Sequence, residues 1–307
     1  MKNKLIILII TALAIVLAGC GTSTSKISEE NKDSKPKTIT YQSETGPVKV
    51  PANPKRIVVL SGFAGNVLAF NKNVVGVDAW SKKNPRFKEL LKDTKEVSED
   101  NLEGIIALKP DLIIALNTVK DKEKLEKIAP TVLYTYGKVP YLEQTLEIGK
   151  AINQEKEVAA WIKDFKARTK VSGDKIKAHI GKDATISILE KYNKQIYVYG
   201  DNWGRGSEII YQEMGLNMPE SVKKTALKDG YYAVSPEEIG KFMGDYVILS
   251  TSKGADNSFE KTATFKEIPA VKNNHIIEVQ LESFYFNDPL TLDFQLKTIT
   301  DGLLKMK

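Results

Sequence analysis

A long helical pattern occupies the middle of this chain, from Gln154 to Ile180. Apolar side chains recur at helical spacing through these 27 residues, and a single helix of that length would extend for about 40 Å. Gly173 is the weak point of the pattern, because glycine disfavours the interior of a helix. A stiff element of this length separates the residues that precede it from those that follow, so the chain is expected to fold as two halves.

Short runs of β-branched residues alternate with amphipathic stretches on both sides of this predicted helix. Before it, the pattern predicts strands at residues 57–60, 74–77, 112–116 and 132–136 and helices at residues 64–70, 102–108 and 122–129. After it, the pattern predicts strands at residues 184–189, 196–199, 246–249 and 276–279 and helices at residues 206–214, from residue 235 onward and at residues 289–304. Such alternation indicates parallel sheet with helices on both faces. The predicted fold class is α/β, with two lobes joined by the single long helix and a ligand cleft between the lobes.

Two of the predicted helices carry N-terminal signals. Ser235 is expected to cap a helix, with Pro236 in its first position and Glu238 completing a capping box. Asp288 and Pro289 are expected to begin the last helix in the same way.

The first twenty residues have the pattern of an export signal. An apolar run from Leu5 to Ala18 is interrupted only by Thr11 and is shorter than the roughly 20 residues that span a bilayer. The run ends in Leu-Ala-Gly-Cys20, which matches a lipoprotein cleavage site. Cys20 is therefore expected to carry acyl chains as the new N-terminus, and two such chains are enough for stable anchoring. We expect the mature protein on the extracellular face of the cell membrane.

The composition of the residues that follow the export signal predicts a flexible linker. Residues 21–38 contain one aliphatic side chain, Ile27, which is too little to repay the entropy of ordering. The chain has 45 Lys plus Arg against 39 Asp plus Glu, and removal of Lys2 and Lys4 with the signal would lower the net charge from +6 to +4. The remaining lysines are scattered among acidic residues, so we expect no nucleic-acid partner.

Few residues indicate catalysis or a metal site. Cys20 is the only cysteine, and the two histidines, His179 and His275, are expected to be surface or structural residues. The sequence lacks a Gly-x-Ser-x-Gly elbow, a phosphate-binding Gly-x-x-x-x-Gly-Lys loop and a His-Glu-x-x-His motif. We therefore expect that the protein is not an enzyme, that it holds no metal through its own side chains and that it has no covalently bound cofactor.

One arginine lies in an unusual setting. Only four of the 45 basic residues are Arg, and Arg205 follows a predicted strand within Tyr-Val-Tyr-Gly-Asp-Asn-Trp-Gly-Arg-Gly, residues 197–206. The loop at the carboxyl end of a strand is where ligands dock on an open α/β sheet, and aromatic rings with an arginine suit a bulky ligand that has oxygen acceptors. An equally weighted alternative is that Trp203 packs in the core and that Arg205 pairs with a nearby carboxylate.

A second aromatic cluster, Phe284-Tyr285-Phe286, precedes the last predicted helix. Three consecutive aromatic side chains cannot all face the core of one lobe. At least one of them is therefore expected to face a cleft or an interface.

Six short motifs together resemble one known family. They are Pro51-x-x-Pro54-Lys-Arg56-Ile-Val-Val, Lys109-Pro110-Asp111-Leu-Ile-Ile, Ile128-Ala-Pro130-Thr-Val, Tyr199-Gly-Asp-Asn-Trp-Gly-Arg205-Gly, Gly244-Asp245-Tyr246 and Tyr285-Phe-Asn-Asp-Pro289. The likeness covers nearly the whole mature chain, and the family is that of the iron-siderophore-binding lipoproteins of Gram-positive ABC importers. The last three motifs are most similar to the group that binds ferric hydroxamates such as ferrichrome and ferrioxamine.

The resemblance implies a fold and a binding site. It implies two Rossmann-like lobes bridged by one long helix, and a monomer. It also implies that one side of the siderophore pocket is lined by Tyr197, Trp203, Arg205 and Tyr285, with Arg205 donating to the iron-bound hydroxamate oxygens. Some hydroxamate receptors have Trp at the position of Tyr285. For the N-terminal wall, which varies more in the family, the candidates are Phe63, Trp80, Asn117 and Tyr136.

The resemblance also implies partners. Family members dock on a permease, which works with an ATPase, through one acidic residue on each lobe, and the matching residues are Glu103 and Glu237. A simpler reading is that each is a first-turn acid that favours the helix dipole. The iron needs no protein ligand, because the siderophore already fills its six positions.

The charge of the predicted pocket distinguishes between ligands. A ferric tris-catecholate carries about three negative charges and needs several cations, whereas a ferric trihydroxamate is nearly neutral and needs aromatic walls and one or two donors. The first hypothesis is therefore a lipid-anchored receptor for Fe(III)-hydroxamate siderophores. The alternatives are a receptor for ferric citrate or a ferric catecholate and, from another class, a cell-surface hydrolase.

These interpretations divide the chain into five predicted segments. They are a signal peptide at residues 1–19, a lipid-anchored linker at residues 20–38, an N-terminal lobe at residues 39–150, a long helix at residues 151–181 and a C-terminal lobe at residues 182–307.

Overall fold

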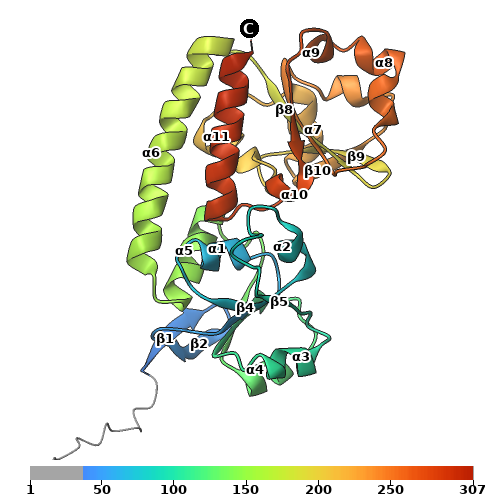
Figure 1. Ribbon diagram of the computed structural model, residues 1–307. Coiled ribbons are helices and arrows are strands. Elements are labelled where there is room, and N and C mark those ends of the chain that lie inside the picture. The colour runs from blue at the N-terminus through green and yellow to red at the C-terminus, as the bar shows by residue number, and fades with distance from the viewer. Residues whose placement is uncertain (1–36, 307) are drawn as a thin grey trace, which may run out of the picture. The chain divides into compact units, whose positions relative to one another are not determined.

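A computed structural model describes residues 37–306. The predicted signal peptide, Cys20 and nearly all of the predicted linker lie outside the described residues. The described residues form two α/β lobes that are joined by helix α6 (Glu155–Ile180), as predicted (Figure 1). Within residues 37–306, no helix combines the length and the apolar character that crossing a membrane requires.

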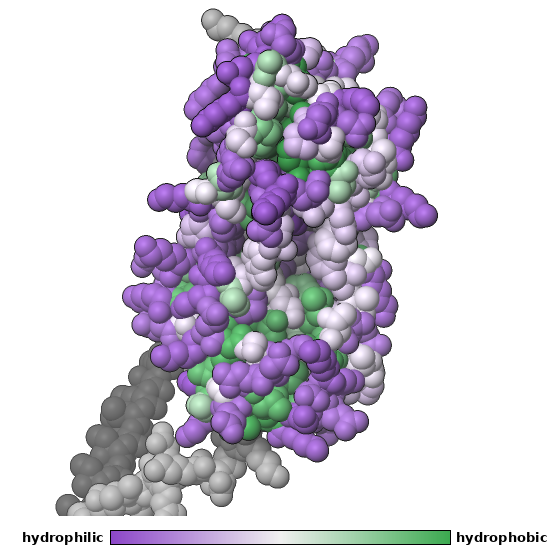
Figure 2. All heavy atoms as spheres, turned by 90° about the vertical axis from the view of Figure 1, so that its right-hand side faces the viewer, coloured by the Kyte–Doolittle hydropathy of each residue, from purple (hydrophilic) through white to green (hydrophobic). Residues whose placement is uncertain are grey.

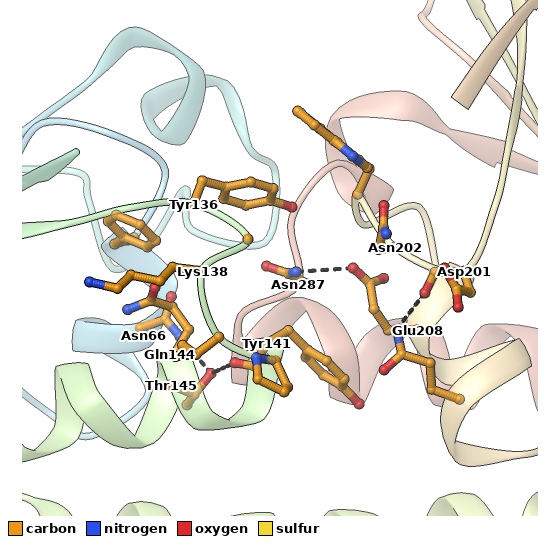
Figure 3. Close-up of a pocket in the computed structure, with 16 residues that line it drawn as sticks. Asn66, Tyr136, Lys138, Tyr141, Gln144, Thr145, Asp201, Asn202, Glu208 and Asn287 are labelled. Carbon is orange, nitrogen blue, oxygen red and sulfur yellow. Dashed lines mark hydrogen bonds between the residues drawn. The ribbon is translucent and has the colours of Figure 1, made fainter. Parts of the chain in front are cut away.

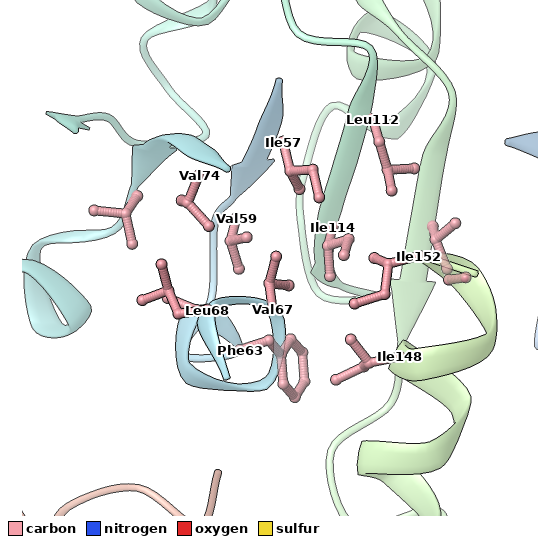
Figure 4. Packing of buried hydrophobic residues seen from close by; sticks show 14 of the residues in the cluster. Ile57, Val59, Phe63, Val67, Leu68, Val74, Leu112, Ile114, Ile148 and Ile152 are labelled. Atoms are coloured by element: carbon pink, nitrogen blue, oxygen red, sulfur yellow. The ribbon is translucent and has the colours of Figure 1, made fainter. Parts of the chain in front are cut away.

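The N-terminal lobe is built around a parallel five-stranded sheet in the order β5-β4-β3-β6-β7. Its elements are β1 (Thr38–Ser43), β2 (Gly46–Pro51), β3 (Ile57–Val59), α1 (Ala64–Leu68), β4 (Val74–Val77), α2 (Ala79–Lys83), β5 (Lys95–Glu96), α3 (Leu102–Ala107), β6 (Leu112–Leu116), α4 (Lys122–Ile128), β7 (Thr131–Tyr134) and α5 (Tyr141–Ala151). Because helices cover both faces of the sheet, β3 and β7 are buried along their whole length and read as apolar runs rather than as alternating patterns. Figure 4 shows one face of this core, where Val59 and Ile114 meet Val67 of α1 and Ile148 of α5.

An antiparallel hairpin of β1 and β2 precedes this sheet and was not predicted. Its register begins with Thr38 opposite Pro51, so the predicted linker extends one residue too far. Only Tyr41 and Val50 of the two strands are buried, which explains why the apolar pattern is too weak to reveal the hairpin.

The C-terminal lobe has a mixed sheet in the order β10-β9-β8-β11-β12, which corrects the prediction of a parallel sheet. Its elements are β8 (Ile186–Tyr192), β9 (Gln195–Tyr199), η1 (Glu208–Glu213), α7 (Glu220–Ala226), β10 (Tyr231–Val234), η2 (Ile239–Lys241), β11 (Tyr246–Thr251), η3 (Ser258–Lys261), α8 (Ala263–Lys266), α9 (Pro269–Lys272), β12 (Ile276–Gln280), α10 (Leu281–Phe284) and α11 (Pro289–Lys305). β8 and β9 are antiparallel because the turn between them is too short for a crossover, and Asn193 in this turn has a φ of 51°. β10 adds a second antiparallel edge, whereas β11 and β12 run parallel to β8.

The long helix begins one residue after the predicted Gln154 and ends at Ile180 as predicted, whereas the segment boundary placed at residue 151 is wrong because Ala151 is the last residue of α5. The helix continues through Gly173 without a break. A Cβ at this position would lie 2.6 Å from the carbonyl oxygen of Met214, so the glycine allows α6 to pack closely against the end of η1. The residue that looked unfavourable for the helix is therefore required by its packing.

Two other predicted helices differ from expectation. The capping box at Ser235 does not form, because the backbone oxygen of Ser235 accepts from the amide of Glu238 in a turn, and only the three-residue 3₁₀ helix η2 follows. Gly240 and Gly244 disfavour a longer helix here. The helix predicted at residues 206–214 is a π-helix, η1, in which the amide of Met214 donates to the oxygen of Ile209 at 2.8 Å.

The segment between α10 and α11 makes a packing contact between the lobes. Asp288 caps α11 as predicted, because its carboxylate accepts from the amides of Leu290 and Thr291 at 3.0 and 3.1 Å. Phe286 packs against the core of the N-terminal lobe, where its ring stacks on that of Phe87 with centroids 6.1 Å apart. The lobes are therefore joined by α6 and held together by this aromatic contact.

Candidate functional site

The loop that follows β9 has a rare backbone conformation. Four consecutive residues, Trp203 to Gly206, have positive φ values of 80°, 76°, 60° and 87°, and two of them are not glycine. A left-handed conformation costs a residue with a side chain about 1–2 kcal/mol and persists only where neighbours enforce it. Here the amide of Arg205 donates to the carbonyl of Phe284 at 2.8 Å, and the amide of Gly204 donates to Glu208 Oε1 at 2.8 Å. These contacts fix the directions of the Trp203 and Arg205 side chains.

Arg205 is buried and forms an ion pair with Glu190. Its Nε donates to Glu190 Oε2 at 2.7 Å, its Nη2 donates to Oε1 at 3.1 Å, and its Nη1 donates to the carbonyl of Trp203 at 2.7 Å. Burial alone would lower the pKa of the guanidinium, but the hydrogen bonds and the charge of Glu190 raise this pKa above its ordinary value. A guanidinium has five N–H groups, so these three bonds leave two donors for a ligand. Arg205 therefore pairs with a carboxylate, as the alternative interpretation predicted, and this pairing leaves two of its N–H groups available as donors.

Aromatic rings surround this ion pair. The guanidinium carbon of Arg205 lies 4.1 Å from the ring centroid of Tyr285 and 4.7 Å from that of Tyr199. A cavity of about 290 Å³ opens here, and its lining residues are Glu190, Tyr192, Tyr197, Tyr199, Trp203, Arg205, Tyr231 and Tyr285. The structure therefore brings together the four residues predicted for this side of the pocket, which are Tyr197, Trp203, Arg205 and Tyr285.

A larger cavity of about 670 Å³ is lined by residues of both lobes (Figure 3). Its lining residues are Phe63, Asn66, Tyr136, Gly137, Lys138, Val139, Pro140, Tyr141, Gln144, Thr145, Asp201, Asn202, Trp203, Glu208, Gln212 and Asn287. Figure 2 shows a face that is hollowed between the two lobes, with residues of intermediate hydropathy around the hollow. Trp203 lines both cavities and is 41% exposed, so it is not a core residue.

The four residues predicted for the N-terminal wall lie in different places. Trp80 stacks on Tyr285 with centroids 4.8 Å apart and planes 17° apart, and Tyr136 lies against Trp203 at 5.1 Å. Phe63 belongs mainly to the N-terminal core and reaches the larger cavity with part of its surface. Asn117 lines neither cavity; it is exposed and donates to Thr135 Oγ1 at 2.8 Å.

Comparison with known proteins places this geometry in a family. The family model for periplasmic binding proteins matches residues 65–281. The chain belongs to the periplasmic binding protein family.

Several well-covered relatives of this periplasmic binding protein have names that refer to iron(3+) hydroxamates or to a siderophore. The iron(3+)-hydroxamate-binding protein FhuD of Bacillus subtilis is 36% identical over 95% of this chain and 95% of its own length. The structure of the FhuD protein from S. pseudintermedius is 39% identical, with a TM-score of 0.79 over 87% of this chain and 98% of that chain. The structure of FhuD2 from Staphylococcus aureus with bound ferrioxamine B is 38% identical, with a TM-score of 0.78 over 82% of this chain and 99% of that chain.

Sequence reasoning missed three lining residues of the smaller cavity in this periplasmic binding protein. They are Glu190, Tyr192 and Tyr231, whereas Tyr199 belongs to the aromatic motif at residues 197–206. One signal for Glu190 was present, because a carboxylate within an apolar strand must have a partner if it is buried. The antiparallel register of β8 and β9 places Glu190 opposite Tyr197, next to the strand end that leads to Arg205.

The histidines of this binding protein take structural contacts. His179 Nε2 lies 2.7 Å from the carbonyl oxygen of Met306, and the ring of His275 stacks on that of Tyr246 with centroids 4.2 Å apart. Between residues 37 and 306, no three residues among His, Cys, Asp and Glu come together as metal ligands would.

The two acidic residues considered for permease docking are both exposed. Glu103 lies in the first turn of α3, which Asn101 caps by accepting from the amide of Gly104 at 2.9 Å. Glu237 lies in the turn before η2 and not in a helix, so a helix dipole does not account for its position.

Proposed function

We propose that this periplasmic binding protein captures a ferric hydroxamate siderophore, of the ferrioxamine or ferrichrome type, and delivers it to an ABC permease and its ATPase for iron uptake. Tyr197, Trp203 and Tyr285 would provide aromatic walls for the ligand. Arg205 would donate its two remaining N–H groups to the iron-bound hydroxamate oxygens. The names of FhuD and of the ferrioxamine-bound FhuD2 support this ligand class.

The ion pair of Glu190 and Arg205 is the observation that carries the proposal. The carboxylate cancels the positive charge of the guanidinium, and both groups are buried. The smaller cavity therefore has hydrogen-bond donors and aromatic surface but no net positive charge among its lining residues. A nearly neutral ferric trihydroxamate suits such a wall, whereas a trianionic ferric catecholate would need unpaired cations.

The remaining parts of the proposal concern partners and location. We propose that Glu103 and Glu237 engage the permease, since both carboxylates are exposed and lie on different lobes. Lipid on Cys20 would hold the protein at the extracellular face of the membrane, in agreement with relatives named as lipoproteins. The protein would act as a binding component rather than as an enzyme, with its cargo as its ligand and no resident cofactor.

Intrinsic fluorescence tests the proposed ligand class, because Trp203, Trp80 and several tyrosines surround the site. The protein is titrated with ferrioxamine B, ferrichrome, ferric citrate and a ferric catecholate. We expect saturable quenching by the two hydroxamates at sub-micromolar concentrations. Failure of both hydroxamates to bind below about micromolar concentration, or tighter binding of the citrate or catecholate complex, would overturn the proposal.

A further inference from the structure

Two adjacent tyrosines at the start of β10 face opposite sides of the C-terminal sheet. Tyr231 and Tyr232 are 44% and 42% exposed, so burial does not distinguish them. Tyr231 lies opposite Tyr199 of β9 and lines the smaller cavity, whereas the ring of Tyr232 lies against that of Phe242, with centroids 5.6 Å apart. Neighbouring residues of a strand point to opposite faces, so only Tyr231 belongs to the face that carries the site.

Tyr231 contacts three of the aromatic rings near Arg205. Its ring lies edge-on to those of Tyr197 and Trp203, with centroids 5.8 Å apart in both pairs and planes 77° and 82° apart. Its centroid also lies 6.3 Å from that of Tyr199. Aromatic pairs favour the edge-to-face arrangement. Tyr231 therefore restricts the orientations of two rings that are proposed as walls for the ligand.

The residue before Tyr231 makes a second contact with Trp203. Gly230 has a φ of 83°, and a Cβ added to it would overlap Cδ1 and Nε1 of the Trp203 indole. The indole therefore lies directly on the backbone of Gly230, an approach that the absence of a side chain allows. The carbonyl of Gly230 accepts from the amide of Gly200 at 2.9 Å, which fixes this backbone to the end of β9.

Few other contacts restrain the Trp203 ring. Trp203 is 41% exposed, and its Nε1 donates to no acceptor among residues 37–306. Its other ring contact is with Tyr136, at 5.1 Å, and comes from the N-terminal lobe. An exposed side chain without a hydrogen bond loses rotamer freedom when a ligand binds, so a ring that is already ordered lowers the cost of binding.

We propose that Tyr231, together with Gly230, positions the Trp203 ring for siderophore binding, so that Tyr231 is a further positioning residue of the smaller cavity. The inference rests on the proposed function, because Trp203 is one of the aromatic walls assigned to that ligand. Tyr231 acts through its ring, which limits the rotation of the indole before the ligand arrives. The phenol hydroxyl is not needed for this role.

Three variants test the role of Tyr231 in binding. We expect Tyr231→Ala to weaken the binding of ferrioxamine B about fivefold, as the loss of one aromatic pair implies. Tyr231→Phe keeps the ring and should retain the affinity of the unaltered protein. Tyr232→Ala removes an equally exposed ring from the opposite face of the same strand and should not change the affinity. Isothermal titration calorimetry provides the dissociation constants.

A double-variant cycle tests whether Tyr231 acts through Trp203. In the Trp203→Ala protein, the further change Tyr231→Ala should weaken binding by less than about twofold, because the ring that Tyr231 positions is absent. An equal loss in the presence and absence of Trp203 would mean that Tyr231 contacts the ligand independently, and it would overturn the proposal.

A measurement without ligand reports the position of the indole directly. The chain has three tryptophans, so a protein with Trp80→Phe and Trp161→Phe retains Trp203 as its only one. In that protein we expect Tyr231→Ala to lower the fluorescence anisotropy of Trp203, because the indole gains freedom to rotate. Tyr232→Ala should leave the anisotropy unchanged. A change in ring mobility is a readout that a general loss of stability would not produce at a temperature where both proteins are folded.

Gly230→Ala tests the second contact independently. The added methyl group should displace the indole and weaken binding at least as much as Tyr231→Ala does. The control is Gly254→Ala, because Gly254 has a similar φ of 79° and no atom within 4 Å of an added Cβ. Equal affinities of the two glycine variants would contradict the contact with Trp203.

The possible outcomes separate this inference from the proposed function. If the unaltered protein binds ferrioxamine B and Tyr231→Ala binds it equally well, the positioning role is wrong and the proposed function stands. A loss of affinity that Tyr231→Phe does not restore would also overturn the role of the ring. If the unaltered protein does not bind ferrioxamine B, the proposed function fails, and the anisotropy still shows whether Tyr231 holds Trp203.

Discussion

The carboxylate of Glu190 holds the guanidinium of Arg205 through two hydrogen bonds, of 2.7 Å to Nε and 3.1 Å to Nη2. Glu190 comes from the interior of β8, and Arg205 comes from the strained loop after β9. The pair fixes the plane of the guanidinium, so that its free N–H groups point in set directions. Because the guanidinium is ordered before the ligand binds, the entropic cost of binding is lower.

Replacing Arg205 should weaken hydroxamate binding. We expect Arg205→Ala to lower the affinity for ferrioxamine B by more than about tenfold, because two charge-assisted hydrogen bonds to the ligand are lost. Arg205→Lys keeps the charge but loses the planar arrangement of donors, so most of the loss should persist. Titration of both variants by fluorescence quenching provides the measurement. An affinity for Arg205→Ala equal to that of the unaltered protein would show that Arg205 supports the loop without binding the ligand.

Replacing Glu190, the ion-pair partner of Arg205, should change both stability and ligand preference. Glu190→Gln leaves a buried guanidinium without a counter-charge, so the free energy of unfolding should fall by about 3 kcal/mol. The uncompensated charge should also shift binding toward anionic ligands, which is measured as the affinity for ferric citrate relative to ferrioxamine B. Glu238→Gln, whose partner Lys241 is exposed, should alter neither quantity noticeably. An unchanged preference in Glu190→Gln would contradict the charge argument made for the smaller cavity.

The glycine between Trp203 and Arg205 offers a test of the loop geometry. A Cβ at Gly204 would lie 2.3 Å from the carbonyl oxygen of Tyr285, so Gly204→Ala should displace the loop and abolish sub-micromolar binding. The matched control is Gly254→Ala, because Gly254 has a similar φ of 79° and no atom within 4 Å of the added Cβ. In both variants the left-handed backbone costs about 1 kcal/mol, so the difference between their melting temperatures reports the steric contact alone. Similar losses of stability in the two would argue against close packing at Gly204.

The N-cap of α11 should make stability depend on pH. Burial raises the pKa of the Asp288 carboxyl to about 6 in the folded protein, against a value near 3.8 when it is exposed. Because the folded state holds this proton more tightly, the carboxyl stabilises the fold below pH 4, and this contribution is lost as the pH rises through about 6. The loss should reach roughly 3 kcal/mol.

Asp288→Asn isolates this effect, because the amide keeps an oxygen for the amides of Leu290 and Thr291. Urea unfolding of both proteins between pH 4 and pH 7.5 gives the measurement. The free energy of unfolding of the unaltered protein, taken relative to that of Asp288→Asn, should fall as the pH rises. A difference that is constant over this range would show that Asp288 titrates normally.

If Glu103 and Glu237 dock on the permease, replacing them should impair transport without changing ligand binding. Glu103→Ala and Glu237→Ala should leave the affinity for ferrioxamine B unchanged, and the double variant should impair siderophore-dependent iron uptake by cells that lack the native protein. Glu123→Ala is the control for Glu103, since both are acids in the first turn of a short helix in the N-terminal lobe. Uptake that survives the double change would exclude these two residues from docking.

Much of the fold followed from local patterns. The bounds of α6 and of β4 and β6 could be predicted because each is a periodic or continuous apolar segment. β10 could not, because Tyr231, Tyr232 and Ala233 at this sheet edge are all exposed and show no alternation. The capping box at Ser235 matched a sequence rule, but no long helix follows to use it.

The candidate site likewise contains some residues that could be predicted from the sequence and others that could not. Trp203 and Arg205 stand out as rare residues in a glycine-rich turn, but composition left a structural alternative of equal weight, and the family resemblance was needed to assign them to the pocket. Glu190 is 15 residues away from Arg205 along the chain, and only the register of two strands brings them together. The larger cavity depends on the contact of both lobes around Tyr136 and Trp203, which no local pattern encodes.

The packing of Phe286 against the N-terminal core has a consequence for synthesis of the chain. Phe286 and Leu290 pack against a core whose other members lie between Ile39 and Ile152. A ribosome releases that first part more than a hundred residues before it releases Phe286. The N-terminal lobe, although it is made first, therefore gains its last two apolar contacts only when nearly the whole chain has been made.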